Sequence, residues 1–321
     1  MTERRFSYDE PIMVSIRCIT YNHAPYIRQC LEGFVMQKTN FRFQAVVHDD
    51  ASTDGTTEIV KEYAEKYPDI IVPMYEEENR WSKHDGTLLT VMLPYMYCAK
   101  YWAECEGDDY WTDPLKLQKQ VDILESNRDI KLVYTAFKCV GTKGENIIRS
   151  AYNANMRMST SGDVLDKLFQ RNFIQTCSIC MRMELIKSSI LQNCPSKFDY
   201  AYFLTSACAG DVAYIPQITC AYRKSDNGVT IAFNKEVNNG LWNVYRYFVS
   251  IYYSGKTKRI RPLKRQFIRC NILYNYLKHE NYLKELIEYD SWIFLYFPFA
   301  YFLLVLNKIK NYYYYYIDQK K

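Results

Sequence analysis

Apolar and polar residues alternate along the first part of the chain in a pattern that predicts strands and helices in turn. Runs of β-branched and aromatic residues predict buried strands at 14–20, 41–47, 70–75, 101–105 and 131–137. Between them, apolar residues recur at helical spacing and predict helices at 25–35, 57–67, 86–99 and 113–124. This alternation requires crossover connections, so we expect an α/β fold with a mostly parallel sheet flanked by helices.

The pattern is less regular in the second half of the chain. We expect a helix at 163–171, a strand at 176–181, a helix at 200–209 and two short strands around Pro216. From residue 234 the sequence becomes basic, aromatic and helical in character. We therefore divide the chain into a sheet domain, residues 1–233, and a helical, aromatic-rich C-terminal extension, residues 234–321.

The extension contains an uncharged run, WIFLYFPFAYFLLVL at 292–306, that bears on membrane contact. A bilayer span needs about 20 apolar residues, whereas this run is shorter and is interrupted by Pro298. Lysines follow it at 308, 310, 320 and 321. We therefore favour peripheral contact with a membrane surface over a buried core helix, and both over a true span.

Charge and cysteine content narrow the class of protein. The net charge of +5 is small, whereas a nucleic-acid-binding surface is strongly and locally basic, so we expect no nucleic-acid partner. The start, MTERRFSYDEP, lacks the apolar segment of a secretion signal, and the eleven scattered cysteines are an odd number. We expect reduced thiols in a cytoplasmic protein, at the inner face of the cytoplasmic membrane if the extension contacts lipid. Cys177 and Cys180 have CxxC spacing, but without a second pair they favour a buried strand over zinc or redox chemistry.

Three polar clusters follow the first, second and fourth predicted strands, at 21–23, 48–55 and 106–109. Because neighbouring parallel strands end at one edge of a sheet, and ligands bind beyond that edge, we expect the clusters to converge. The last cluster, in CEGDDYWTDP, places three carboxylates in four positions. Carboxylates this close raise one another's pKa unless a cation lies among them. Hard oxygen ligands suit Mg²⁺ or Mn²⁺, and the alternative, a solvated acidic turn, is disfavoured by the aromatic residues that follow.

Two of these stretches, HDDASTDGTTEIV and ECEGDDYWTDPLKLQKQVDIL, resemble the signature loops of family-2 glycosyltransferases. That family comprises inverting enzymes of the GT-A fold, with a DDGSxDGT-like loop after the second strand and a DxD-type motif further on. The resemblance is strong over residues 14–137 and weaker to 223, and the EGDDYW form is similar to the branch that makes bacterial surface polysaccharides. It implies a Rossmann-like GT-A core, with the C-terminal extension outside the family pattern.

The resemblance implies a role for individual residues. Asp50, with Asp49, would contact the nucleoside of a nucleotide-sugar donor, Asp108 would bind Mn²⁺ or Mg²⁺, and Asp109 would touch the sugar or the metal shell. Glu106 stands where the family usually has the first Asp of its motif. The donor-binding residues implied in this way are Thr20, Asn22, Asp49, Asp50, Asp54, Glu106, Asp109 and Arg223.

Inverting transfer also needs a base that takes the proton of the acceptor hydroxyl. The stretch KFDYAYFLTSACAGDVAYIPQITCAYR resembles the family segment that carries this acid, and Asp199 falls on the matching position. The alternatives are that Asp199 only caps the following helix, or that Asp211 is the base.

The sequence departs from the family pattern at one point and leaves another open. Ser225 stands where relatives often have a histidine after the YR pair, so Arg223 or Lys224 would supply charge instead. A basic residue near the donor is also expected between the two acidic loops, and its candidates are Arg80, Lys83 and His84.

The function implied by the resemblance is transfer of a sugar, with inversion, from a nucleotide-sugar to a glycan or polyprenyl-linked acceptor in bacterial cell-surface polysaccharide synthesis. A sugar-phosphate nucleotidyltransferase is an alternative, but it usually has a glycine-rich basic loop after the first strand, and ITYNHAPYI has no glycine. A non-catalytic nucleotide-sugar-binding or scaffold protein is disfavoured by the retained Asp50, Asp108 and Asp199.

Overall fold

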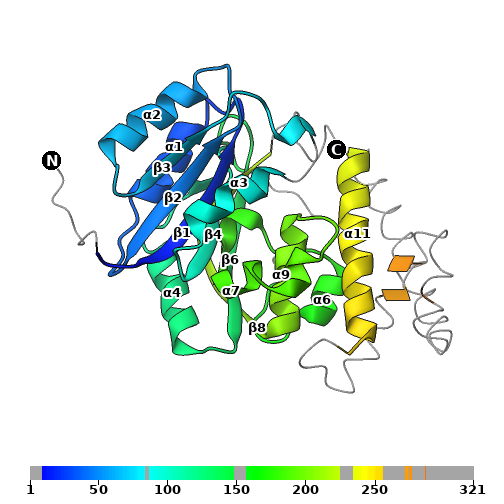
Figure 1. Cartoon of the computed structure of the whole chain (residues 1–321). Coiled ribbons are helices and arrows are strands. Elements are labelled where there is room, and N and C mark those ends of the chain that lie inside the picture. Colours follow the sequence, from blue (N-terminus) through cyan, green and yellow to red (C-terminus); the bar gives the residue numbers. More distant parts are fainter. Residues whose placement is uncertain are drawn as a thin grey trace, which may run out of the picture.

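The structure is a computed structural model that describes residues 9–83, 87–147, 157–224 and 234–255, with residues 272, 273, 275, 276 and 286. The run at 292–306, His84 and Ser225 lie outside these described residues. An eight-stranded sheet lies at the centre and helices cover both of its faces (Figure 1). No helix in the described segments is long and apolar enough to cross a bilayer.

The strand order across the sheet is β3-β2-β1-β4-β7-β6-β8-β5. The strands are β1 Ile12–Thr20, β2 Arg42–Asp49, β3 Ile71–Tyr75, β4 Tyr101–Glu104, β5 Tyr110–Trp111, β6 Ile130–Val140, β7 Ile179–Arg182 and β8 Asp211–Arg223. β3, β2, β1 and β4 are parallel, as predicted. β7 is antiparallel to β4 and β6, and β5 to β8, so the second half of the sheet is mixed.

The longer predicted helices are present, with ends that differ by a few residues. They are α1 Ile27–Val35, α2 Thr56–Lys66, α3 Thr87–Met96, α4 Lys116–Ser126, α6 Leu165–Gln170, α9 Asp199–Ala209 and α11 Asn234–Tyr253. Shorter turns that the pattern did not predict are α7 Met183–Ile186, α8 Ser189–Gln192, η1 Trp81–Lys83 and η2 Thr176–Ser178. The predicted strand at 176–181 therefore begins only at Ile179, although Cys177 and Cys180 are both buried.

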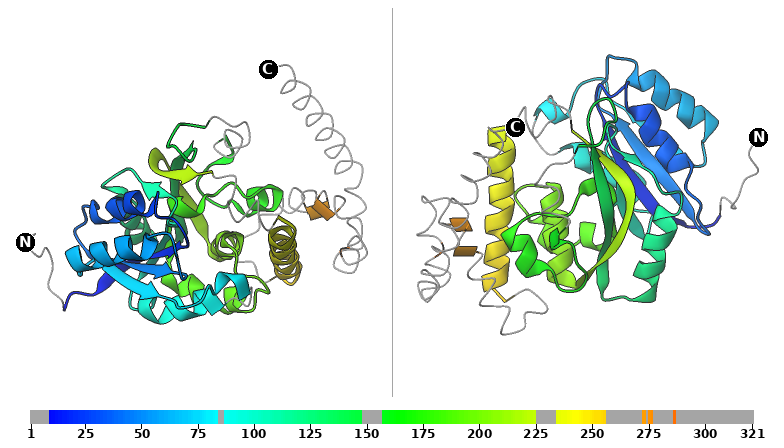
Figure 2. Two further views of the ribbon diagram at one scale, coloured as in Figure 1. Left: turned by 90° about the horizontal axis from the view of Figure 1, so that it is seen from above. Right: turned by 180° about the vertical axis from the view of Figure 1, so that it is seen from behind.

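The sheet separates two hydrophobic cores, one on each face. Val14, Ile16 and Cys18 face the core that α1, α2 and α4 cover. The opposite core contains Trp102 of β4 and the inner faces of α3, α9 and α11. Figure 2 shows α11 on the side of the molecule away from α1 and α2. The part of the extension that the structure describes thus packs against helices of the predicted sheet domain.

The two short strands predicted around Pro216 are instead one continuous strand, β8. Thr135 pairs with Ile215, but the next residue, Ala136, pairs with Ile218. Pro216 therefore lies in a bulge, where its missing N–H breaks no ladder hydrogen bond. The prediction was wrong because a bulge accommodates the proline without ending the strand.

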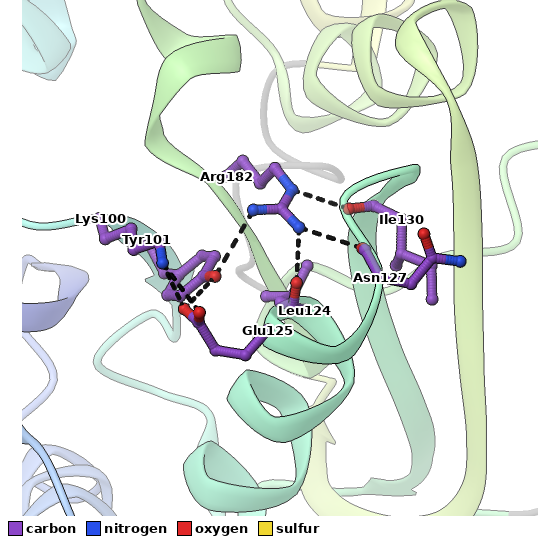
Figure 3. A network of polar contacts seen from close by, with 7 residues as sticks. All are labelled: Lys100, Tyr101, Leu124, Glu125, Asn127, Ile130 and Arg182. Atoms are coloured by element: carbon purple, nitrogen blue, oxygen red, sulfur yellow. Dashed lines mark hydrogen bonds and ion pairs between the residues drawn. The ribbon is translucent and has the colours of Figure 1, made fainter.

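Arg182 of β7 joins the lower end of the sheet to α4 (Figure 3). Its guanidinium donates to the carbonyl oxygens of Ile130 at 2.8 Å, Leu124 at 2.5 Å and Asn127 at 3.1 Å. Leu124 and Asn127 lie at the C-terminal end of α4, where helix carbonyls lack partners within the helix and favour a positive charge. This buried arginine therefore closes α4 and holds it against β6 and β7.

We expect Arg182→Met to lower the free energy of unfolding by about 3 kcal/mol, because the buried carbonyl of Leu124 and the carbonyls of Asn127 and Ile130 each lose a donor. Lys100→Met is the matched control, since Lys100 makes an exposed ion pair with Glu125 that contributes about 0–1 kcal/mol. Urea unfolding of both variants measures the difference. Equal losses would contradict the structural role of Arg182.

Candidate active site

The carboxyl end of β1 joins the turns that follow β2 and β4. The backbone N–H of Asp50 donates to the carbonyl of Thr20 at 3.0 Å, and that of Gly107 to the carbonyl of Ile19 at 2.9 Å. Because β1 lies between β2 and β4, both turns reach the same strand end. The expected convergence of the three polar clusters is therefore confirmed.

Gly107 lets the turn after β4 approach β1 closely. A Cβ atom at this position would lie 2.5 Å from Oγ1 and 2.7 Å from Cβ of Thr20, which is closer than such atoms pack. Thr20 is fully buried here, and its hydroxyl lies 3.2 Å from Nδ1 of His23. Thr20 thus packs directly against the turn that follows β4.

Asn22, Asp49 and Asp54 organise the turn between β2 and α2. Asn22 has a positive φ of 53°, and its amide oxygen accepts from the N–H of Thr53 at 2.9 Å. Asp54 accepts from the N–H of Ala24 at 3.0 Å and from Thr56. Although burial opposes the shift, these bonds lower the pKa of Asp54.

Asp49 accepts from the N–H of Ser52 at 3.3 Å and from the Thr57 hydroxyl, which ties the turn to α2. All three acidic or amide side chains therefore shape the loop through contacts with its backbone.

Asp50 is fully buried and holds the segment after β3. Its carboxylate accepts from the backbone N–H groups of Arg80 at 2.7 Å and Trp81 at 3.0 Å. Arg80 pairs with Glu76 at 2.7 Å, and Glu76 also contacts His48 at 3.1 Å. The segment borders a cavity of ≈ 420 Å³ lined by Tyr75, Glu76, Glu77, Glu78 and Arg80.

The acidic turn after β4 presents the carboxyl groups of Glu106 and Asp108. Glu106 is exposed and Asp108 is half-buried. None of the residues that the structure describes donates a hydrogen bond to either side chain. The protein atoms around the carboxyl of Glu106 reduce its hydration, and this effect, followed by the charge of Asp108, raises its pKa to about 8. Burial and then Asp108 also raise the pKa of Asp109 well above its usual range. A cation at this turn would relieve the repulsion.

Arg223 holds this turn in place and is almost completely buried. Its backbone N–H donates to the Asp109 carboxylate at 2.7 Å, and its Nε to the carbonyl of Asp108 at 2.8 Å. The Nη groups donate to the carbonyl of Gly141 and to Gln29 of α1, both at 2.9 Å. The guanidinium is engaged with the protein in this arrangement. It therefore does not favour the expected direct contact of Arg223 with a nucleotide-sugar.

Asp199 is the first residue of α9 and does not act as its N-cap, which is Phe198. Its carboxylate accepts from the Thr176 hydroxyl at 2.8 Å and from the N–H of Tyr200 at 2.7 Å. Burial raises its pKa above the ordinary value of 3.8, against the effect of these hydrogen bonds. Its charge in turn raises the pKa of Glu106, which indicates that the two carboxyls are near one another.

A charged pair in the sheet beside these acids was not predicted from the sequence. Arg17 of β1 donates from Nε to Glu104 of β4 at 2.7 Å, and Trp102 donates to the same oxygen at 2.7 Å. An arginine inside the otherwise apolar run VSIRCIT was the available signal. Of the basic candidates near the donor, Arg80 pairs with Glu76, whereas His84 lies outside the described residues.

The acidic turn fits a divalent metal that is only partly held by protein. In the described segments, no three histidine, cysteine or acidic side chains are close enough to hold a metal by themselves. Mg²⁺ and similar ions are commonly held by one or two carboxylates together with substrate phosphates. The unpartnered carboxylates of Asp108 and Glu106 meet that requirement.

Comparison with known proteins identifies the family. The model for glycosyl transferase family 2 matches residues 15–188, which is more than half of the chain. The chain belongs to this family. An uncharacterized protein of Mycobacterium tuberculosis (strain ATCC 25618 / H37Rv) is 33% identical over 219 residues, 67% of this chain and 60% of that protein. The chain thus spans about 60% of the length of this relative.

A second relative is TuaG of Bacillus subtilis (strain 168), named as a teichuronic acid biosynthesis glycosyltransferase. It is 23% identical over 247 residues, which cover 76% of this family-2 chain and 92% of TuaG.

Solved structures share the fold at low sequence identity. S. aureus TarS in complex with UDP has a TM-score of 0.59 and 17% identity, covering 83% of this chain and 72% of TarS. The mannosyltransferase PcManGT from Pyrobaculum calidifontis, in complex with GDP-Man and Mn²⁺, has a TM-score of 0.50 and 17% identity, covering 94% and 91%. The predicted GT-A fold is therefore confirmed.

We expect Arg223→Lys to loosen the acidic turn, because an ammonium cannot donate in three fixed directions as a guanidinium does. Hydrogen–deuterium exchange should become faster at residues 106–111, while Arg28→Lys, which alters an exposed pair with Glu62, serves as the control. Unchanged exchange at the turn would show that Arg223 does not position it.

Proposed function

We propose that this chain transfers a sugar, with inversion, from a nucleotide-sugar donor to a glycan or polyprenyl-linked acceptor in cell-surface polysaccharide synthesis. The observation that carries the proposal is the convergence of the turns after β2 and β4 on the end of β1. It places the carboxylates of Asp108 and Glu106, which have no hydrogen-bond donor among the described residues, beside a loop suited to a nucleoside. Membership of glycosyl transferase family 2 and the likeness to TuaG support the reaction class and the acceptor class.

The donor would lie across both turns. The turn of Asp49 and Asp50, next to the cavity beyond β3, would receive the nucleoside, as the ligands of TarS and PcManGT support by analogy. Each oxygen of the Asp50 carboxylate accepts one hydrogen bond and has a second lone pair for a base N–H, but the carboxylate is fully buried, so this contact requires the segment of Arg80 and Trp81 to move. Asp108, with Glu106 nearby, would hold Mn²⁺ or Mg²⁺ against the diphosphate. Such an ion, when bound, stabilises the negative charge that develops on the leaving diphosphate.

Asp199 would act as the general base. The acceptor oxygen forms a bond to C1 of the sugar while the bond from C1 to the diphosphate oxygen breaks, and the electron pair leaves with the nucleoside diphosphate. The acceptor proton passes to the Asp199 carboxylate, which Thr176 orients. Because burial raises the pKa of Asp199, its carboxylate is a stronger base than an exposed aspartate.

Asp108→Asn should lower Mn²⁺-dependent release of nucleoside diphosphate from a nucleotide-sugar by about 100-fold or more, because charge stabilisation of the leaving group is lost. Asp122→Asn, at an exposed position of α4, is the control. Thermal unfolding should show that both variants remain folded. Full activity of the Asp108 variant in the presence of a chelator would refute the metal role.

Asp199→Asn should lower turnover by about 100- to 10,000-fold with little effect on donor affinity, as expected for a base. In the unaltered protein the rate should fall as pH decreases through a pKa above 3.8, because protonation of Asp199 removes the base. Asp211→Asn tests the rival acid at the start of β8. If that variant loses turnover and Asp199→Asn does not, the base is assigned wrongly.

A further inference from the structure

Arg17 is charged, recessed and only partly engaged by the protein. Its Nε donates to Glu104, and its side chain keeps 12% of its surface exposed. A guanidinium has five N–H donors, and within the described part of the chain no group accepts from either Nη group of Arg17. Four donors are thus available beside Glu104, the last residue of β4, with which Arg17 of β1 is paired.

The position of Arg17 relates it to both parts of the proposed site. Its carbonyl accepts from the N–H of Cys105, so it lies directly before the acidic turn. Its guanidinium lies 5.7 Å from the ring of Trp102, which contacts Tyr202 one helical turn after Asp199. Its charge also opposes the rise in the pKa of Glu106 and Asp199, which is consistent with this proximity.

The buried pair is a poor device for stability alone. Glu104 is 1% exposed, and its Oε2 is buried without a hydrogen-bond partner in the described residues. Buried ion pairs often recover no more than their cost of desolvation, and apolar residues of similar size frequently replace them without loss. A contribution to stability therefore does not explain why the Nη groups of Arg17 remain available.

We propose that Arg17 is a specificity-determining residue that donates from its Nη groups to hydroxyl or carbonyl oxygens of the transferred sugar. This assignment rests on the proposed function, since the sugar is the group attached to the diphosphate above the acidic turn. Glu104 neutralises Arg17, and the carboxyl groups of Glu106 and Asp199 are close by, so the site offers no net positive charge to an anionic ligand group. A neutral sugar oxygen accepts from Arg17 and, as a hydroxyl, can donate to these carboxylates.

The test compares nucleotide-sugar and nucleotide affinity in the double variant Arg17→Met/Glu104→Met. Removing both charges avoids the unpaired buried charge that either single change would leave. Titrations with UDP, UDP-GlcNAc, GDP and GDP-mannose, each with Mn²⁺, give the ratio of sugar-nucleotide to nucleotide affinity. The matched control is Arg28→Met/Glu62→Met, which removes an exposed ion pair, joined by two hydrogen bonds, outside the proposed site.

We expect the double variant to retain nucleoside diphosphate affinity and to lose about tenfold or more in nucleotide-sugar affinity. Arg17→Lys, which keeps the positive charge but not the planar set of guanidinium donors, should show the same selective loss to a smaller extent. An unchanged ratio, or equal loss of both affinities, would overturn the assignment, since either result fits a structural pair. If the unaltered protein binds no nucleoside diphosphate, the proposed function fails instead.

Discussion

The site depends on the attachment of two turns to the carboxyl end of β1. Two backbone hydrogen bonds, from Asp50 to Thr20 and from Gly107 to Ile19, attach the turns of both neighbouring strands to it. The close approach of Gly107 to Thr20 leaves no room for a side chain. Since each turn carries acidic residues, this attachment brings negative charge from separate parts of the sequence to one edge of the sheet.

Two arginines from different strands, Arg17 of β1 and Arg223 of β8, compensate part of this negative charge. Arg223 fixes the acidic turn through its backbone and leaves Asp108 and Glu106 available. Arg17 lies in the sheet and pairs with Glu104, so its charge is balanced while its outer donors remain available. The protein thus compensates part of the acidic charge and leaves the remainder at the exposed turn, where a divalent ion and a diphosphate would complete the balance.

The parallel half of the sheet could be predicted from sequence because its strands are short apolar runs that end in polar clusters. The long β8 could not, because a bulge around Pro216 has no distinct signal in one sequence. The acidic residues were found through their motif, whereas Arg17 and Glu104 are far apart in the chain and become partners only when β1 and β4 pair. The engagement of Arg223 likewise depends on contacts with α1 and with Gly141, just after β6, that no local pattern reveals.

The most direct test of the shared site is an anomalous-scattering map from crystals grown with a nucleoside diphosphate and Mn²⁺. The account predicts a manganese peak at the Asp108 carboxylate, next to the diphosphate, with the base beside the turn of Asp49 and Asp50. Manganese away from Asp108, or a nucleotide bound at another face of the molecule, would contradict it.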